Sequence, residues 1–408
     1  MPITTARGIF LCLAVAAAAP CAEAQDSNDS VVVFENARVI VGDGSAPIEN
    51  ARFVVEGGRF AAVGAADGVD APEGADVIDL GGLTVMPALV DTHTHLSRTR
   101  NELIEDLRQR ARFGVGAAAS LGQDEELAFE VRGEDIPGAA RLYTAGRGIT
   151  TPEPGRSEIP YWITTADEGR AAVRELAERE VDIVKIWVDD RNGQYEKLSP
   201  ELYRAIIDEA HRHDLKVTAH IYYLEDAKEL QRAGLDAFAH GIRDTDVDDE
   251  VIALFKMRPE VVLVPNLPDP GVPVDLGWLR GRIPDETLER LEAASTERPE
   301  AQAAFGIQAR NLDRLADEGV TIAMGTDGNS PWAPHLEMED MVRAGMEPHD
   351  VIVAATRNSA ALIGHDGGTI EPGRSADFIV LEGDPIEDIT NTRRIVDVYL
   401  RGERIERR

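Results

Sequence analysis

His93 and His95 end the apolar segment PALVDTHTHL and are separated by a single residue. Side chains two residues apart on a strand point to the same side, so both imidazoles would converge there. Two converging imidazoles make a suitable pair of metal ligands. Alone, the pair is a weak signal, because buried histidines are also common as hydrogen-bonded structural residues. It gains weight from the polar residues that follow.

Three further polar residues each finish an apolar run. His220 ends KVTAH, His240 ends AFAH and Asp327 ends IAMGTD. A single such residue would be read as a satisfied buried polar group, but recurrence at the ends of successive apolar runs indicates a shared site. Imidazoles and a carboxylate suit zinc, with manganese or iron as alternatives.

Lys185 lies in the middle of the aliphatic segment VDIVKIWV. Alternation places Val184, Ile186 and Val188 on one face and Lys185 on the opposite, interior face. An ammonium beside divalent metal ions would be repelled, so the lysine must lose its proton or change chemically. A carbamate formed with CO2 would be an anion able to bridge two metals. The alternative is an ion pair with an acid such as Asp189.

The elements that must position these residues alternate apolar runs with amphipathic ones. Eight strand candidates are expected: 87–96, 115–122, 141–148, 181–188, 216–223, 237–241, 261–267 and 321–328. Helical runs such as TADEGRAAVRELAERE, with Thr165 as N-cap, stand between them. The pattern predicts an α/β fold with a (β/α)8 TIM-type barrel, which keeps its catalytic residues at the carboxyl ends of the strands. A doubly wound sheet is the alternative, but no G-x-G-x-x-G turn follows the first strand.

Both ends of the chain read as short strands with glycine-rich turns between them. We expect residues 30–85 and 366–408 to form one composite β-sandwich domain, and residues 86–365 to form the barrel. Residues 266–286 interrupt the barrel after its seventh strand and are expected to be a lid or a substrate loop.

The chain resembles the amidohydrolase superfamily in the order of its motifs, which are VMPALVDTHTHL, the strand lysine, AH, AHG and GTD. The C-terminal stretch GGTIEPGRSADFIVLEGDPIEDI resembles its imidazolonepropionase-like and prolidase-like members. The resemblance implies that His93, His95 and Asp327 bind one metal ion, and that carbamylated Lys185 bridges to a second ion held by His220 and His240. It also implies that Asp327 takes a proton from a metal-bridging hydroxide and passes it to the leaving group.

The expected activity is metal-dependent hydrolysis of an amide, peptide or cyclic amide bond, with dipeptides or N-acyl amino acids as leading substrates. Deamination is disfavoured, because the residue three after His220 is Tyr223 where deaminase-like relatives carry Glu. One departure from peptide-cleaving relatives is WVDDRNG after the lysine, in place of a glycine-rich turn. The alternatives are a lactone or ester hydrolase on the same site and a binding protein that retains the barrel without turnover.

Two residues near the expected site are candidates for contact with the substrate. Tyr222 shares the strand face of His220 and could donate to a substrate carboxylate, although a packed tyrosine is an equal alternative. Arg243 follows His240 by three residues and is expected either to bind an anionic group or to pair with Asp244 or Asp246.

Composition restricts the partners and the compartment. The net charge of −32 disfavours nucleic acid and anionic membranes, which would repel the chain. A small-molecule substrate is expected, and a homo-oligomer stays open. Residues 1–24 have one basic residue, an apolar run too short to span a bilayer and a small-x-small end, which predicts a signal peptide and a periplasmic or secreted protein. Both cysteines lie in that segment, so thiolate ligands are excluded from the mature chain.

Overall fold

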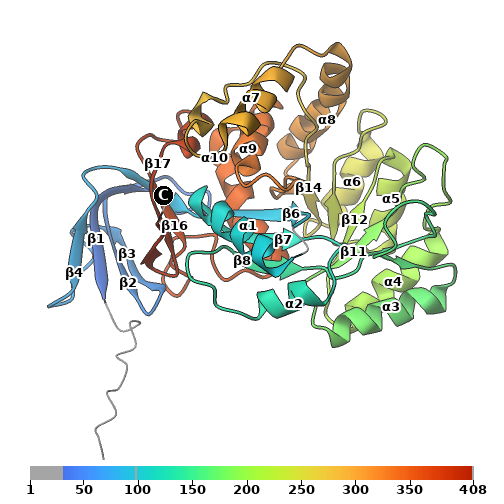
Figure 1. Ribbon diagram of the computed structural model, residues 1–408, viewed down its shortest axis with the longest axis horizontal. Helices are drawn as coiled ribbons and strands as arrows, with labels where there is room; N and C mark the ends of the chain where they lie inside the picture. Colours follow the sequence, from blue (N-terminus) through green and yellow to red (C-terminus); the bar gives the residue numbers. More distant parts are fainter. Residues whose placement is uncertain (1–30, 97–98, 407–408) are drawn as a thin grey trace, which may run out of the picture.

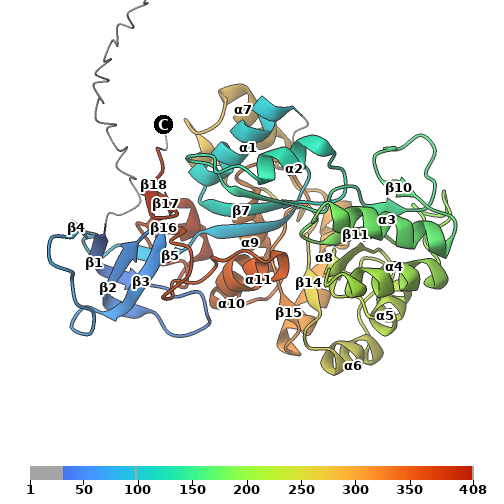
Figure 2. The same ribbon diagram turned by 90° about the horizontal axis from the view of Figure 1, so that it is seen from below.

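A computed structural model describes residues 31–96 and 99–406. The predicted signal peptide lies outside the described residues. At one end of the molecule the two terminal segments of the chain form a β-sheet, and helices α3 to α6 lie at the opposite end (Figures 1 and 2).

The terminal sheet contains eight strands in the order β18-β17-β16-β5-β1-β2-β3, with β4 also paired to β1. Its strands are β1 (Val32–Val39), β2 (Ile48–Glu56), β3 (Arg59–Ala65), β4 (Asp76–Asp79), β5 (Thr84–Pro87), β16 (Phe378–Leu381), β17 (Ile395–Leu400) and β18 (Glu403–Arg404). Antiparallel pairing of β5 with β16 joins the N-terminal and C-terminal segments. The two terminal segments thus form one composite, connected sheet, and the predicted division into two sheets of a sandwich is not confirmed.

The physical reason is the pairing of β1, which bonds to β2 on one side and in parallel to both β4 and β5 on the other. The sheet packs around aromatic rings from strands that are not all neighbours. Phe34 of β1 stacks on Phe53 at 4.8 Å and meets Phe378 of β16 edge-on at 5.2 Å. These buried rings are the core of the terminal sheet.

The middle of the chain supplies a strand at each of the eight predicted positions. They are β6 (Leu89–Thr94), β7 (Val115–Ser120), β8 (Arg141–Thr144), β11 (Val184–Trp187), β12 (Val217–His220), β13 (Ala237–Ala239), β14 (Val262–Val264) and β15 (Thr321–Ile322). A short pair, β9 (Ile149–Thr150) and β10 (Tyr161–Trp162), continues the chain after β8. All neighbouring pairs among these strands are parallel.

The predicted closed barrel is not formed by continuous strand pairing. The parallel strands fall into a three-stranded ladder, β6-β7-β8, and a seven-stranded ladder from β10 to β15. Between the ladders run isolated backbone hydrogen bonds, among them Thr92 N to Met324 O (3.1 Å), Asp327 N to His93 O (2.8 Å) and Asp182 N to Thr144 O (3.0 Å). At the junction between β6 and β15, the interruption follows from the two-residue length of β15 and from irregular register along β6.

Helices follow the parallel strands and cover their outer side. They are α1 (Arg100–Arg112), α2 (Glu126–Arg132), α3 (Ala166–Glu178), α4 (Pro200–Arg212), α5 (Leu224–Ala233), α6 (Asp249–Met257), α7 (Asp285–Ala294), α8 (Pro299–Asp317), α9 (Ala333–Arg343), α10 (Pro348–Val353) and α11 (Ser359–Ile363), with short turns η1 (Gly277–Leu279), η2 (Ala354–Asn358) and η3 (Ile389–Arg393). Thr165 caps α3 in a reciprocal capping box with Glu168, as predicted. Among the described residues, none of the helices is long and apolar enough to cross a membrane.

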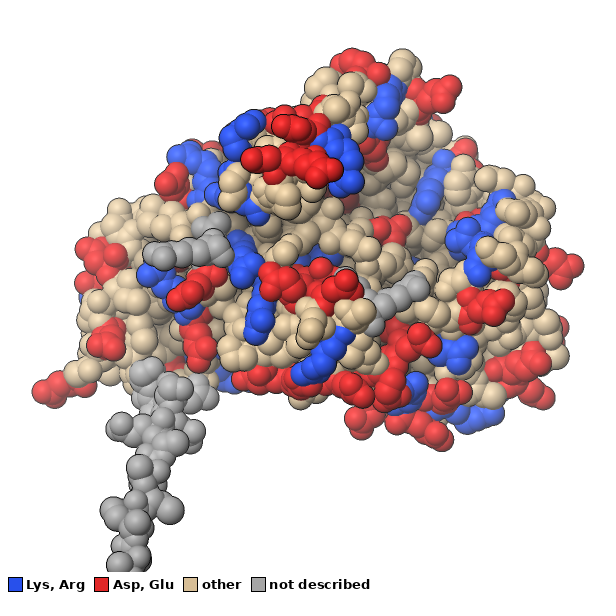
Figure 3. Space-filling view, viewed as in Figure 1, with Lys and Arg blue, Asp and Glu red and all other residues tan. Residues whose placement is uncertain are grey.

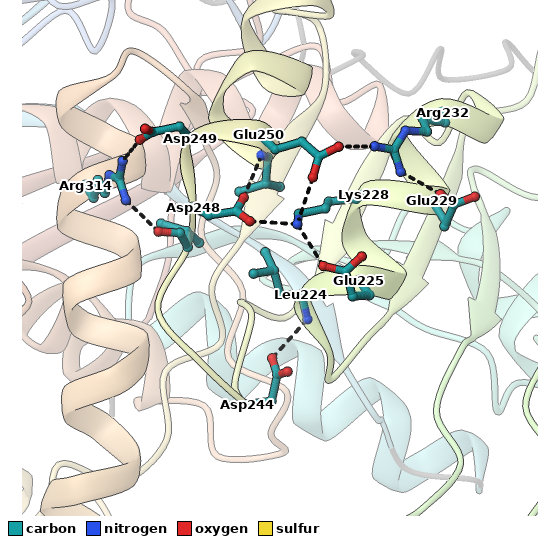
Figure 4. Close-up of polar contacts among 12 residues, drawn as sticks. Leu224, Glu225, Lys228, Glu229, Arg232, Asp244, Asp248, Asp249, Glu250 and Arg314 are labelled. Atoms are coloured by element: carbon teal, nitrogen blue, oxygen red, sulfur yellow. Dashed lines mark hydrogen bonds and ion pairs between the residues drawn. The ribbon is translucent and has the colours of Figure 1, made fainter.

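The chain has 74 Asp and Glu residues against 42 Lys and Arg, and on the face shown in Figure 3 acidic side chains lie at many separate places. Part of this acidic surplus gathers around one lysine between α5 and α6 (Figure 4). Lys228 is 3% exposed and donates to Glu225 (2.7 Å) and Asp248 (2.7 Å), and its ammonium lies 3.0 Å from Glu250. Hydrogen bonds to Asp248 and Glu225 raise the pKa of Lys228 above its usual range. This lysine thus offsets the mutual repulsion of several carboxylates.

Candidate metal centre

The residues predicted to bind metal come together at the carboxyl ends of the parallel strands. His93 and His95 lie at the end of β6, His220 ends β12, His240 follows β13 and Asp327 follows β15. The donor atoms of His93, His95 and Asp327 lie within 4.8 Å of one another. Asp327 is open to solvent, whereas His93 is 1% exposed, so the site has a buried floor and an accessible mouth.

Three imidazoles face the carboxylate of Asp327. Nε2 of His93 and of His95 lie 3.2 and 3.0 Å from Oδ1, and Nε2 of His240 lies 3.6 Å from Oδ2. Metal–ligand bonds of about 2.0–2.1 Å in a tetrahedral zinc site separate neighbouring donors by about 3.3 Å. The His93 and His95 spacings are close to that separation, so His93, His95 and Asp327 fit a divalent ion, and His240 lies beside this set at the longer spacing.

A second group of donors lies beside the first. The rings of His220 and His240 are 4.4 Å apart between centroids, and the rings of His240 and His93 are 5.1 Å apart. Lys185 is fully buried, and its Nζ has no hydrogen-bond partner within residues 31–96 and 99–406. A buried polar group without a partner is costly. The unsatisfied amine of Lys185 is therefore consistent with its conversion to an anionic ligand.

Lys185 faces the interior, as alternation predicts. Val184, Ile186 and Val188 pack in the cluster that includes residues of the covering helices, whereas Ile183 packs among interior residues. Gly122 makes room for the lysine: a Cβ there would lie 3.0 Å from Lys185 Cγ and 2.5 Å from the Trp187 ring, and its φ of +89° is unfavourable for other residues. The position beside the strand lysine thus requires glycine.

The alternative partner for the lysine, Asp189, is engaged elsewhere. Its Oδ2 lies 2.9 Å from His220 Nε2 and accepts a 2.7 Å hydrogen bond from Arg191. Arg191 Nη1 also lies 3.2 Å from His220 Nε2. The lysine–Asp189 ion pair that the sequence left open is therefore not formed, and WVDDRNG places a carboxylate and a guanidinium beside a predicted ligand.

Burial keeps three histidines of the site in the neutral form that can bind a metal ion. Desolvation lowers the pKa of His220 to about 4 and the pKa of Lys185 to about 7, and it lowers the pKa of His240 and His93 well below 6.5. Burial alone would raise the pKa of Asp327, but the hydrogen bond from His95 and nearby positive charges hold it below its usual range. Neutral imidazoles with an ionised carboxylate are the forms that ligate metals.

Sequence reasoning missed a supporting residue, Asn266. Its Oδ1 lies 3.0 Å from His93 Nδ1, which directs Nε2 of that ring toward the site. Asn266 has a φ of +45°, as an asparagine tolerates. It lies just after the apolar run VVLVP, so the rule that found the other candidates could have found it.

The two predicted substrate residues follow β12 and β13, the strands that position His220 and His240. Arg243 is mostly buried, and its Nε and Nη2 have no hydrogen-bond partner in the part of the chain that the structure describes. Burial lowers the pKa of Arg243, and the negative charges of Asp327 and Asp189 partly offset this effect. Tyr222 is half-buried, its ring meets Tyr223 at 5.0 Å, and its carbonyl accepts from Arg243 N (3.0 Å).

The predicted lid segment 266–286 packs against the protein. Leu276 and Leu279 cluster with Phe113 and the partly buried Trp332. A cavity of about 260 Å³ lies beneath this segment and reaches Thr326, the neighbour of Asp327 in the chain.

The amidohydrolase family profile matches residues 84–405 of this chain. The chain belongs to the amidohydrolase family. An imidazolonepropionase of Geobacillus thermodenitrificans is 27% identical over 383 residues, which covers 82% of this chain and 84% of that one. An enamidase of Eubacterium barkeri is 25% identical over 362 residues, with 85% of each chain covered.

A solved structure from Bifidobacterium longum, proposed to be a prolidase, superposes with a TM-score of 0.77 at 26% identity and covers 92% of this chain and 94% of that one. Membership of the amidohydrolase family makes the chain a hydrolase acting on carbon–nitrogen bonds, in a family that generally uses divalent metals.

Proposed function

We propose that this amidohydrolase is a binuclear metal-dependent hydrolase of dipeptides or N-acyl amino acids. The observation that carries the proposal is the convergence of His93, His95 and Asp327, with Arg243 nearby, whose Nε and Nη2 have no hydrogen-bond partner among the described residues. His93, His95 and Asp327 would hold one ion. His220, His240 and a carbamate on Lys185 would hold the second. Zinc fits the donor set, and manganese and iron are the alternatives.

Two divalent ions, when bound, would supply Lewis acidity and make water a better nucleophile at neutral pH. Asp327 then acts as the general base and acid. Its carboxylate is ionised at neutral pH, so it can accept the proton of the attacking water. It is also open to solvent at the mouth, so the same oxygen can pass that proton to the departing nitrogen.

Arg243 would bind the carboxylate of the substrate. Because Nε and Nη2 of its guanidinium are buried and lack partners in the part of the chain that the structure describes, they are available to bind a planar anion. Tyr222, whose carbonyl accepts a hydrogen bond from the backbone N–H of Arg243, would donate a further hydrogen bond to the substrate carboxylate. A free carboxylate next to the scissile amide is shared by dipeptides and N-acyl amino acids. From the predicted signal peptide, we also propose that the enzyme acts in the periplasm or outside the cell.

A paired substrate panel tests this assignment. Dipeptides and N-acyl amino acids with a free C-terminus should exceed their C-terminal amides in kcat/KM by about 10–100-fold, the value of a hydrogen bond to a charged group. Arg243→Met should abolish this preference, mainly through KM. Arg258→Met is the matched control, because Arg258 donates to the carbonyls of Gln231 and Leu235 instead of lying at the site. Equal rates for acids and amides in the wild type, or turnover of lactones alone, would contradict the proposed substrate class.

A further inference from the structure

The turn that carries Asp327 has an unfavourable backbone. Asp327 has a φ of +52°, in the left-handed region that costs energy for residues other than glycine. Such a conformation persists only where the surroundings hold it. Part of the hold is direct, because Asp327 N and Thr326 N both donate to the carbonyl of His93, at 2.8 and 3.2 Å.

A buried ion pair also stabilises the turn that carries Asp327. The carboxylate of Asp91 accepts from Thr326 N (3.1 Å), Thr326 Oγ1 (2.8 Å) and His93 N (3.3 Å). Arg110 of α1 donates to the same carboxylate through Nη1 (3.1 Å) and to Gly328 O through Nη2 (3.1 Å). The pair thus binds the residues on both sides of Asp327 and, at the same time, the backbone of His93.

Stability alone does not account for this ion pair. Both side chains are 0% exposed, and a buried ion pair is commonly no more stabilising than apolar residues of similar volume. Burial raises the pKa of Asp91 and lowers that of Arg110, and the attraction between the two groups opposes both shifts. Two charges are nevertheless kept at this buried position. Among the described residues, the hydrogen bonds of the Asp91 carboxylate go to Arg110 and to the segments that bear the proposed metal donors, which indicates a role in placing those segments.

We propose that Asp91 and Arg110 are positioning residues that hold the Asp327 turn against the end of β6, so that Asp327, His93 and His95 keep the spacing of a metal site. The inference rests on the proposed metal centre, but it concerns geometry and not the choice of substrate. Neither residue touches the substrate. Their contribution reaches the chemistry through the orientation of Asp327.

The test is the zinc affinity of the full-length protein, measured by competition with a chromogenic chelator. Arg110→Met removes the guanidinium while keeping an apolar side chain of similar length. Loss of such supporting interactions weakens metal binding by about 10–100-fold, and we expect that loss here. Arg393→Met is the matched control, since Arg393 is a buried arginine paired with Glu339 and bonded to Asp275 O. Its zinc affinity should equal that of the wild type.

Two further variants separate positioning from simple destabilisation. Arg110→Lys can reach Asp91 but cannot bridge to Gly328 O at the same time, so its zinc affinity should fall between those of wild type and Arg110→Met. Asp91→Asn combined with Arg110→Met should weaken zinc binding by less than the product of the two single effects, because the residues act as one unit. In zinc-loaded variants kcat should fall while KM changes little.

Wild-type zinc affinity in Arg110→Met would overturn the inference and leave the proposed function intact. An equal loss in Arg110→Met and Arg393→Met would also overturn it, because the effect would then be general. If Arg110→Met does not fold, Arg110→Lys decides: wild-type affinity overturns the inference and intermediate affinity supports it. A wild type that binds zinc but hydrolyses none of the panel would refute the proposed function without touching this inference.

Discussion

Asp327→Asn should leave a folded, metal-loaded protein whose kcat is lower by about two to four orders of magnitude, the range set by loss of a general acid–base group. The amide is nearly the same shape as the carboxylate, but it cannot accept the proton of the attacking water. The low pKa of Asp327 means that the wild-type group is ionised and ready to accept that proton at neutral pH. Steady-state kinetics on the best substrate of the panel measure the loss.

The control for this variant must account for metal, because Asp327 is also a proposed ligand. Metal content is therefore measured on the same preparation by elemental analysis. Asp340→Asn is a matched substitution of a mostly buried aspartate that pairs with Arg343, and it should keep wild-type kcat. If Asp327→Asn with full metal occupancy turns over substrate at the wild-type rate, the assigned role is wrong.

Lys185→Ala should lose the second metal ion and most of its activity. The lysine is fully buried and faces histidines, so an ammonium there would oppose the binding of cations. A carbamate would supply the missing negative charge, and alanine removes it together with the side chain. Metal content should fall toward one ion per chain, as measured by elemental analysis.

Rescue distinguishes the carbamate from a structural role of the lysine. Acetate or propionate can occupy the space that Lys185→Ala vacates, and should restore part of the activity and the second metal ion. Lys185→Arg keeps a positive charge and fills the same space, so the acids should not rescue it. Absence of rescue in Lys185→Ala, together with retention of two metal ions, would show that no anion is needed at this position.

The sequence predicted the positions of the strands better than their connections. Each apolar run between 87 and 328 contains a parallel strand, because such runs are buried on both faces. Closure of the ladder depends on the number of hydrogen bonds between the first and last strands, which the pattern of residue types does not encode. The same limit applies to the terminal segments, where strand composition predicted β-structure but not the pairing by which β1 connects the strands on its two sides.

The grouping of the proposed metal donors was predictable because each finishes an apolar run, and parallel strands bring their carboxyl ends together. The residues that hold those donors were not predictable in this way. Asp91 and Thr326 are far apart in the sequence and meet only in the folded chain. Arg110 lies in a helix rich in charged residues, where nothing in its neighbours marks it as buried. Asp189 was considered only as a partner for Lys185, yet it contacts His220.

The most direct test of the account is anomalous diffraction from crystals of the active, zinc-loaded protein. We expect two zinc peaks, one among His93, His95 and Asp327 and the other beside His220 and His240. Density continuous with Lys185 Nζ should show a carbamate between the two peaks. A single peak, with an unmodified Lys185 amine remote from it in a fully active crystal, would contradict the binuclear centre.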